Sequence, residues 1–401
     1  MPKVYLILTP FFPEADSFHG PFIYDQTRAI ERVSDYRVVV VKPYAFWQRG
    51  GDYEFGGVRV LRCPHYAPPS CLLPNGLSDA LSVRALVRKL KEEGIALHDI
   101  AVCHAHVTDL GFYAVRLKRM NPAIKTIVQH HGFDVMSETS GRLARFDWHQ
   151  AWMRRYGRAI CNEADLNVGV SRRTLDYVKA VEGVKLKAEY VLYNGVDTSL
   201  FNPGADNVVH EGFVIGCVGN FWPLKDQLTL IRAAERLIRD GMDDLRVRFI
   251  GSGRTLADCE AYVREHGLSD HIAFLTEVAH DELPAFYRSL DLFVLPSYWE
   301  AFGCVYTESY ACGTPFMAVK GQGIAEIVAA EEADKWLIDK GDDEALSEKI
   351  KAYRQARYAQ RLTIDVGIDS LVRQFLEEHV EESWNHEGHE EGAKFTKTIA
   401  R

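Results

Sequence analysis

Short apolar runs alternate with amphipathic segments along most of this chain, and the alternation runs in two separate series. Short apolar runs are typical of buried strands, and apolar residues three to four positions apart are typical of helices. The first series predicts strands at 4–9, 37–41, 58–62, 100–104, 126–129, 166–170 and 190–192, with helices at 23–33, 78–93, 110–120, 140–164 and 171–181. Strands that alternate with helices predict a parallel, doubly wound sheet.

The pattern stops at a polar stretch that begins with Asn194-Gly-Val-Asp197 and restarts at 213. The second series predicts strands at 213–218, 246–250, 272–275, 292–295 and 316–318, with helices at 226–239, 256–266, 281–289 and 306–312. We therefore predict an N-terminal Rossmann-like domain at 1–198, a C-terminal one at 199–384 whose last helix could cross back, and a polar tail at 385–401. Two tandem doubly wound α/β domains are expected to face a cleft, with ligands at the carboxyl ends of the strands.

Composition excludes several classes of protein. The 401 residues contain 47% hydrophobic and 26% charged side chains, which is typical of a globular chain. The longest apolar runs, at 5–8 and 38–41, fall far short of the ~18 residues that a membrane span needs. No secretory signal pattern follows Met1, and the eight cysteines contain no C-x-x-C spacing. We therefore expect a cytoplasmic protein with reduced thiols.

Charge is unevenly distributed between the two halves. The formal net charge of −9 argues against a general nucleic-acid binder. Residues 1–200 hold 26 Lys and Arg against 21 Asp and Glu, whereas the rest of the chain holds 21 against 35. One interpretation is that the first half faces an anionic partner. The other is a chance imbalance among solvated side chains.

The segment from Leu295 to Glu308 contains the most informative motif. A predicted strand ends at Pro296, a loop holds Glu300, and a helix starts just after Gly303. The first backbone N–H groups of such a helix can bind a phosphate, with a carboxylate on either side to accept hydroxyl hydrogen bonds. Two glutamates eight residues apart are usually surface charges, but Gly303 and the later glycine turns favour a sugar–phosphate site.

Several ordered blocks resemble the retaining glycosyltransferases of family four, which have the GT-B fold and two glutamates separated by seven residues. Asn194-Gly-Val-Asp197 and Phe201-Asn-Pro203 resemble the interdomain motif of that family. His131-Gly-Phe-Asp134 resembles a turn of its first domain, and Ile250-Gly-Ser-Gly253 resembles a glycine turn of its second. The set extends over nearly the whole chain.

The resemblance implies roles for residues of the second domain. Glu308 would hold the nucleotide ribose, and Glu300 would lie by the transferred sugar. The backbone amides of Gly303, Cys304 and Val305 would meet the diphosphate or the sugar, and Lys225 would bind the diphosphate.

This chain departs from the family pattern at two positions. Asn220 stands where the family usually carries arginine, and Asp226 stands where it commonly carries glycine. One phosphate cation is therefore missing, and either Arg254 compensates for it or the donor is posed differently. Val278 lies in the segment where the family recognises the nucleobase through backbone contacts.

In the first domain, the resemblance places His131 beside the transferred sugar, although the adjacent His130 leaves the register open by one residue. Gly20 lies where the family approaches the donor phosphate with a glycine-rich turn. The spacing His104-Ala-His106 could bind a metal ion, but no third ligand follows at a suitable spacing. We therefore predict no metal site and place His106 near the cleft rim.

The resemblance implies transfer of a hexose-type sugar from a UDP- or GDP-type nucleotide diphosphosugar to an acceptor hydroxyl. The anomeric configuration would be retained, and neither a metal ion nor another cofactor would be required. The setting would be bacterial glycan, glycolipid or polysaccharide synthesis. The alternatives are a nucleotide-sugar epimerase, a non-catalytic sugar-binding protein, and a transferase that acts on a small soluble acceptor.

The segment 141–158 bears on the acceptor. It combines Trp148, Trp152 and Tyr156 at helical spacing with five arginines, which are Arg142, Arg145, Arg154, Arg155 and Arg158. Aromatic and basic residues on one helix can engage a membrane interface, which would make the enzyme peripheral at the inner face of the plasma membrane and its acceptor lipid-linked. The other interpretation is that the aromatic residues belong to the core.

Overall fold

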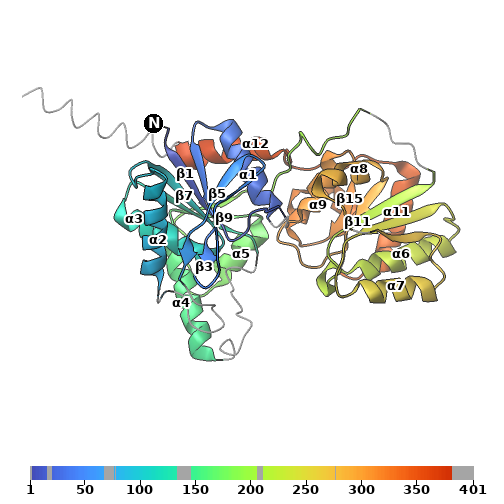
Figure 1. The fold of residues 1–401 in the computed structure, drawn as a ribbon. Coiled ribbons are helices and arrows are strands. Elements are labelled where there is room, and N and C mark those ends of the chain that lie inside the picture. Colours follow the sequence, from blue (N-terminus) through green and yellow to red (C-terminus); the bar gives the residue numbers. More distant parts are fainter. Residues whose placement is uncertain are drawn as a thin grey trace, which may run out of the picture. The chain divides into compact units, whose positions relative to one another are not determined.

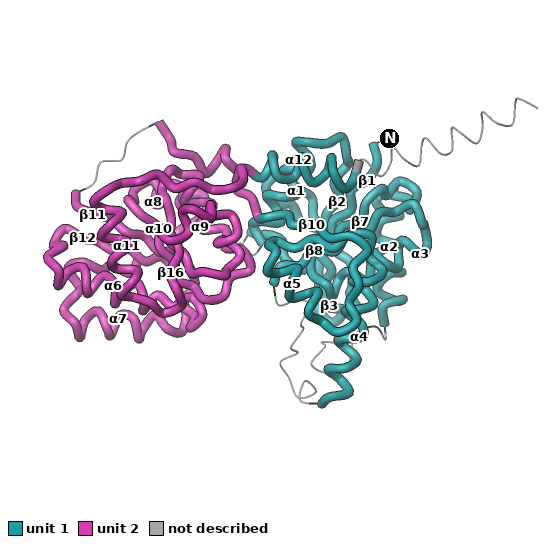
Figure 2. The backbone as a smooth tube through the Cα atoms, turned by 180° about the vertical axis from the view of Figure 1, so that it is seen from behind, with its two compact units in different colours: residues 1–193, 368–401 teal, residues 194–367 magenta. Residues whose placement is uncertain are grey.

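The computed structural model describes residues 2–15, 20–66, 76, 78–132, 146–205, 211–275 and 277–381. The chain forms two compact units (Figure 2). Unit 1 comprises residues 1–193 and 368–401, and unit 2 comprises residues 194–367. Both are α/β units with parallel sheets, which confirms the predicted fold class.

Unit 1 is built on an eight-stranded sheet in the order β10-β9-β8-β7-β1-β2-β5-β4 (Figure 1). All described pairings are parallel except that between β4 and β5. The strands are β1 (Val4–Leu8), β2 (Arg37–Val41), β4 (Tyr53–Phe55), β5 (Val58–Leu61), β7 (Ile100–His106), β8 (Lys125–His130), β9 (Leu166–Gly169) and β10 (Glu189–Val191). A separate two-stranded ribbon pairs β3 (Tyr44–Ala45) with β6 (Pro64–His65).

Helices cover both faces of this sheet, which explains why β1 is buried along its whole length. Leu6 and Leu8 point into a core with α2, α3 and α4, whereas Tyr5 and Ile7 point into a core with α1 and α12. The helices of unit 1 are α1 (Pro21–Val33), α2 (Asp79–Glu92), α3 (Gly111–Met120), α4 (Asp147–Glu163), α5 (Arg172–Ala180) and α12 (Ile368–Leu376).

The last described helix returns to the first unit. Val372 and Phe375 of α12 are fully buried in the core that α1 shares, and Arg32 of α1 forms an ion pair with Asp369 at 2.6 Å. The second unit consequently ends at Gly367; the sequence prediction extended its domain to 384 but allowed its last helix to cross back. The predicted tail at 385–401 lies outside the described residues.

Unit 2 is built on a parallel six-stranded sheet in the order β13-β12-β11-β14-β15-β16. Its strands are β11 (Phe213–Val218), β12 (Leu245–Ile250), β13 (Ile272–Leu275), β14 (Leu292–Val294), β15 (Phe316–Val319) and β16 (Leu337–Ile338). Its helices are α6 (Gln227–Arg239), α7 (Leu256–Glu265), α8 (Leu283–Arg288), α9 (Cys304–Ala311), α10 (Ala333–Trp336) and α11 (Asp343–Ala356). Among the described residues, no helix has the length and apolar character that a membrane crossing requires.

Helix starts show where local sequence was sufficient and where it was not. Ser171 caps α5, because its side chain accepts a hydrogen bond from the Thr174 amide at 3.1 Å. Ser78 precedes α2 but makes no such bond, because its hydroxyl instead donates to the carbonyl of Tyr66 at 2.9 Å. A tertiary contact there replaces the local cap.

Candidate functional site

The strand order of unit 2 reverses between β11 and β14. From β11 the chain moves outward through β12 to β13, and it then returns to the other side of β11 as β14. Open α/β sheets bind ligands at such a reversal, beyond the carboxyl ends of the strands. The loops that follow β11 and β14 contain Lys225 and Glu300, two of the residues singled out from the sequence.

The loop after β11 is packed against the loop after β12. The Phe221 amide donates to the Ser252 carbonyl at 2.8 Å. A Cβ on Gly251 would lie 2.2 Å from the Gly219 carbonyl oxygen, and one on Gly253 would lie 2.4 Å from that of Phe221. Glycine is therefore required at 251 and 253 for the two loops to meet.

Lys225 ends a short 3-10 helix, Pro223–Lys225, that is tied to the loop after β14. The Leu224 carbonyl accepts hydrogen bonds from the Tyr298 amide and the Ser297 hydroxyl, both at 3.0 Å. Lys225 Nζ donates to Glu300 Oε1 at 2.5 Å. The predicted phosphate cation and the predicted sugar-side carboxylate are therefore brought together as an ion pair.

Asp226 follows Lys225 with a φ of +50°, in the left-handed region that favours glycine. Its side chain accepts a hydrogen bond from the Thr229 hydroxyl at 2.8 Å, a local bond of the kind that lets aspartate adopt this conformation. This explains how aspartate can stand where the resembled family commonly has glycine. Burial raises the pKa of Asp226.

Hydrogen bonds fix both the loop that contains Glu300 and the first turn of α9. The Glu300 amide donates to Gln322 Oε1 at 2.9 Å, and the Tyr306 hydroxyl donates to the Leu295 carbonyl at 2.7 Å. Gly303 precedes α9 with a φ of +96°, and an added Cβ would lie 2.7 Å from the Tyr306 ring. Glycine has no side chain that could accept a hydrogen bond from the first amides of α9. The amides of the half-buried Cys304 and Val305 are therefore left without a side-chain cap beside Glu300.

Glu308 lies one turn further along α9 and is 7% exposed. Its Oε2 accepts a hydrogen bond from the Tyr287 hydroxyl at 2.8 Å, and its Oε1 lies 3.5 Å from His280 Nε2. Burial and the nearby carboxylate raise the pKa of Tyr287, so its hydroxyl stays protonated as the donor. The predicted ribose ligand is thus a preoriented carboxylate.

Three other predicted residues lie on the loops around this centre. Asn220 is exposed, and its carbonyl accepts a hydrogen bond from Gln227 Nε2 at 3.1 Å. The Arg254 guanidinium lies over the Trp222 ring, 4.9 Å from its centroid. Val278 is half-buried after β13, two residues before His280. All three lie in the loops that follow the strands β11, β12 and β13.

In unit 1, the strand order reverses between β1 and β7. His131 follows β8 and is half-buried, whereas its neighbour His130 is fully buried and bonds to Asn167 and Thr108. Gly20 starts α1 with a φ of +82°, and a Cβ there would lie 2.9 Å from Phe11 Cβ. Of the two adjacent histidines, His131 is the one with exposed surface.

A column of buried histidines supports His131, and His106 belongs to it: this residue is fully buried, whereas it was predicted near the cleft rim. His106 Nδ1 lies 2.9 Å from His131 Nε2, and the rings of His106 and His104 stack with centroids 4.6 Å apart. His104 Nδ1 in turn contacts the Tyr5 hydroxyl at 2.8 Å. Burial lowers the pKa of His104 to about 3 and that of His106 well below its usual value, so both rings are neutral. The alternating H-x-H spacing on one strand was the available signal.

The aromatic residues in the first turns of α4 are exposed and do not belong to the core. Trp148 and Trp152 of α4 are 55% and 44% exposed, so neither is a core residue. Tyr156 is half-buried, and its hydroxyl donates to Asp79 Oδ2 at 2.9 Å. Arg142 and Arg145 lie outside the described residues. Among the residues that are described, no His, Cys, Asp and Glu side chains gather in threes as a metal site would need.

Both units match profiles of known protein families. The family profile described as "Glycosyl transferases group 1" matches residues 202–362, and that described as "Glycosyltransferase Family 4" matches residues 20–200. A D-inositol 3-phosphate glycosyltransferase of Mycolicibacterium smegmatis is 36% identical over 151 residues, which cover 35% of this chain and 34% of that protein. A protein of the same name from Salinispora arenicola is 34% identical over 211 residues, covering 47% and 45% of the two chains. The chain thus spans less than half the length of these curated relatives.

Solved structures of similar fold extend over the whole chain. Sucrose-phosphate synthase from Thermosynechococcus elongatus aligns over 100% of both chains with a TM-score of 0.66 and 20% identity. The Anabaena protein HepE, solved in complex with UDP and glucose, aligns over 98% of this chain and 100% of its own, with a TM-score of 0.63 and 17% identity. At these identities the likeness shows the fold.

Proposed function

The chain belongs to the group 1 glycosyltransferases of the GT-B fold, and on that basis we propose that it is a retaining, metal-independent hexosyltransferase. The donor is a nucleotide diphosphosugar, and the acceptor supplies a hydroxyl. The single observation that supports this most strongly is the arrangement of Lys225, Glu300 and the first amides of α9 at the strand-order reversal of unit 2.

The diphosphate is the group that this arrangement suits. Lys225 supplies a flexible cation, and the amides of Gly303, Cys304 and Val305 add donors at the positive end of a helix. Both can stabilise the negative charge that grows on a departing diphosphate. Glu308, already oriented by Tyr287, is placed to accept hydrogen bonds from the ribose hydroxyls.

Retention follows from attack on the face that the diphosphate leaves. In the proposed step the bond from the sugar C1 to the phosphate oxygen breaks as the acceptor oxygen bonds to C1. The acceptor proton passes to the departing phosphate oxygen, and Lys225 with the α9 amides bears the charge. Glu300 and His131 orient the sugar, and no covalent bond to the protein forms.

The donor class is supported by the solved relatives. HepE has been crystallised with UDP-glucose, at 18% identity to this chain. We therefore propose a UDP-type donor first and a GDP-type donor second. Asn220, at a position where the family usually has a cation, makes the diphosphate depend more heavily on Lys225, with Arg254 as a candidate for a second cation.

For the acceptor we propose a lipid-linked glycan at the inner face of the plasma membrane. The exposed Trp148 and Trp152 and the positive charge of the first 200 residues support this choice. A small soluble acceptor is the second candidate, and the name of the curated relatives, D-inositol 3-phosphate glycosyltransferase, favours it.

A transfer assay tests the proposal. The protein is incubated with UDP-glucose, UDP-galactose or GDP-mannose, with lipid extract or inositol phosphate as acceptor, and the product is analysed by NMR for its anomeric configuration. We expect a retained configuration and the same rate in the presence of a chelator. Epimerised donor in a reaction without acceptor, an inverted product, or loss of activity with chelator would contradict it.

A further inference from the structure

We propose that one end of unit 1 is a docking face for an anionic phospholipid bilayer. This docking face consists of seven exposed apolar side chains, which are Phe46, Trp47, Tyr66, Leu81, Phe146, Trp148 and Trp152. The inference deepens the proposed lipid-linked acceptor and rests on it for its biological purpose, but binding to a bilayer is measured without any sugar transfer.

Exposure of large apolar side chains is concentrated at this end. Among the residues that the structure describes, unit 1 has nine exposed large hydrophobic side chains, and all but Phe11 and Met120 belong to the docking face. Trp148, Trp47, Phe46 and Leu81 each leave at least half of their surface in solvent. Scattered exposed residues are ordinary, but a contiguous apolar patch marks an interaction site.

Ring stacking and hydrogen bonds join the elements of the docking face. Phe46 stacks on Tyr66 with ring centroids 5.8 Å apart, and the Tyr66 carbonyl accepts the Ser78 hydroxyl at the start of α2. The Tyr156 hydroxyl of α4 donates to Asp79 of α2. In Figures 1 and 2, β3 and α4 lie at the same end of unit 1.

Helix α4 has the two-sided character of an interfacial helix. Trp148, Trp152 and Arg155 follow one another at spacings of four and three residues, which places them on one side, and all are exposed. His149 and Met153 are buried on the other side. Tryptophan, with an apolar ring and a polar N–H, prefers the boundary between lipid and water, and arginine beside it meets the headgroup phosphates.

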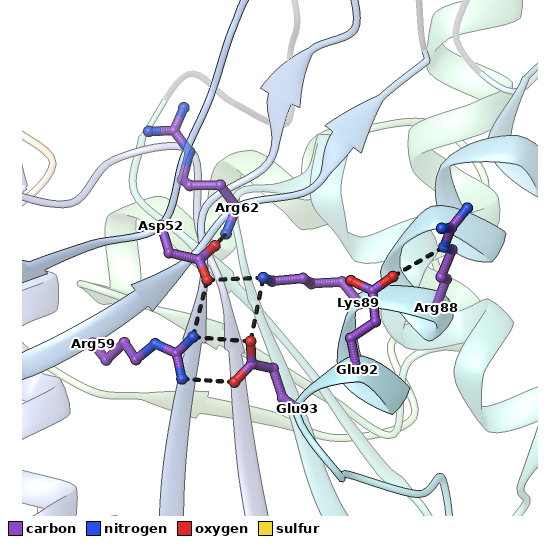
Figure 3. Close-up of polar contacts among 7 residues, drawn as sticks. All are labelled: Asp52, Arg59, Arg62, Arg88, Lys89, Glu92 and Glu93. Carbon is purple, nitrogen blue, oxygen red and sulfur yellow. Dashed lines mark hydrogen bonds and ion pairs between the residues drawn. The ribbon is translucent and has the colours of Figure 1, made fainter.

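Three of the cations at this end are already paired with carboxylates of unit 1. Figure 3 shows that Lys89 and Arg59 share the carboxylates of Asp52 and Glu93, and that Arg88 pairs with Glu92. Those charges are largely cancelled within the unit.

Other arginines at this end form no ion pair within the described part of the chain and remain for a partner. Among them, Arg84 of α2 and Arg155 of α4 are exposed. Arg84 lines an open hollow of about 390 Å³ together with Tyr66 and Leu81. A cation beside two apolar side chains suits a phospholipid headgroup, whose phosphate lies next to its acyl chains.

Vesicle co-sedimentation of the full chain tests the proposal. The vesicles are made either of phosphatidylcholine alone or of equal parts phosphatidylcholine and phosphatidylglycerol. Trp148→Ser probes the apolar contact, and Arg84→Ser and Arg155→Ser probe the charge. Met120→Ser and Arg37→Ser are matched controls, because both side chains are exposed on unit 1 outside the docking face.

We expect the wild-type protein to sediment with the anionic vesicles and to be released by high salt. Each arginine variant should lower the partition coefficient about fivefold, and Trp148→Ser about tenfold or more, whereas both controls should bind as wild type. In the wild type, brominated lipids should quench tryptophan fluorescence, which checks the contact without any variant.

Wild-type protein that stays in the supernatant with anionic vesicles would overturn the proposal, as would variants that bind as tightly as the controls. A concentration-dependent dimer that Trp148→Ser abolishes, without vesicle binding, would assign the docking face to a second copy instead. A thermal-shift titration with the sugar nucleotide is run on the same samples. Donor binding without vesicle binding refutes only the docking face, and vesicle binding without donor binding refutes only the transferase.

Discussion

Replacement of Glu300 by glutamine is expected to tighten the binding of a nucleoside diphosphate and, at the same time, to slow sugar transfer. In the structure Lys225 Nζ donates to Glu300 Oε1 at 2.5 Å, and the two side chains are 22% and 10% exposed. A diphosphate that binds Lys225 must compete with this carboxylate. Glutamine keeps the size of the side chain but removes its charge, so the lysine is released to the ligand.

The magnitude follows from the partial burial of the pair. A hydrogen bond to a charged group typically contributes ~1.5–3 kcal/mol. Because about a fifth of the Lys225 side chain is in solvent, screening places this pair at the lower end, at ~1–2 kcal/mol. That corresponds to about 5- to 30-fold tighter binding of the diphosphate. Loss of an interaction with the reacting sugar should cost ~2–4 kcal/mol of transition-state stabilisation, a fall in turnover of about 30- to 1,000-fold.

Calorimetric titration with UDP and with GDP measures the first effect, and steady-state transfer measures the second. Glu331→Gln is a matched control, because Glu331 is an exposed carboxylate of unit 2 that pairs with Arg361. It should change neither quantity. A Glu300→Gln protein that binds the diphosphate no more tightly than wild type, or that turns over normally, would refute the reasoning.

Three further predictions concern stability. Gly303→Ala should destabilise the protein by ~2–4 kcal/mol, because alanine is strained at a φ of +96° and its methyl group would meet an aromatic ring of α9 at 2.7 Å; urea denaturation should show a smaller loss for Gly267→Ala, which also has a positive φ, of +67°, but offers the added methyl group open space. Tyr287→Phe should cost ~1.5–3 kcal/mol by removing the donor to Glu308, and an unchanged midpoint would contradict that bond. Because burial lowers the pKa of His104 to about 3, the unfolded chain binds more protons below the ordinary histidine pKa of about 6.5. As the pH falls from about 6.5 to 3, the free energy of unfolding should therefore decrease by up to ~1.4 kcal/mol per pH unit. A His104→Gln protein whose free energy of unfolding depends on pH with the same slope would argue against this residue as the cause.

The sequence was sufficient for most strands of both sheets and for the main loops of the site, although it missed the short strands β4 and β16. Parallel strands with both faces covered consist of continuous apolar runs, so β1 and β11 were recognisable, and the chain order fixed which loops follow them. The predicted fold and family are confirmed by the comparisons. The roles of Glu300, Glu308 and Lys225 remain predictions, although the structure places all three at the same sheet edge.

Long-range contacts could not be predicted from local patterns. Lys225 and Glu300 are 75 residues apart, and nothing in either segment indicates that they pair. The return of the last helix was allowed for but could not be fixed, because the apolar residues of α12 would equally suit the second domain. Helical periodicity placed Trp148 and Trp152 on one side of a helix, but it does not reveal whether another element covers that side.

The account depends most on the claim that Lys225 anchors the diphosphate of a sugar nucleotide. Calorimetric titration of the wild type and of Lys225→Ala with UDP-glucose, UDP-galactose and GDP-mannose tests this directly, with Lys351→Ala as a control, because Lys351 of α11 lies outside the site and pairs with Asp240. We expect at least one of the three to bind the wild type and the control equally, and to bind Lys225→Ala about 10-fold or more weakly. Equal affinity of Lys225→Ala and wild type, or no binding of any of the three sugar nucleotides, would contradict the account.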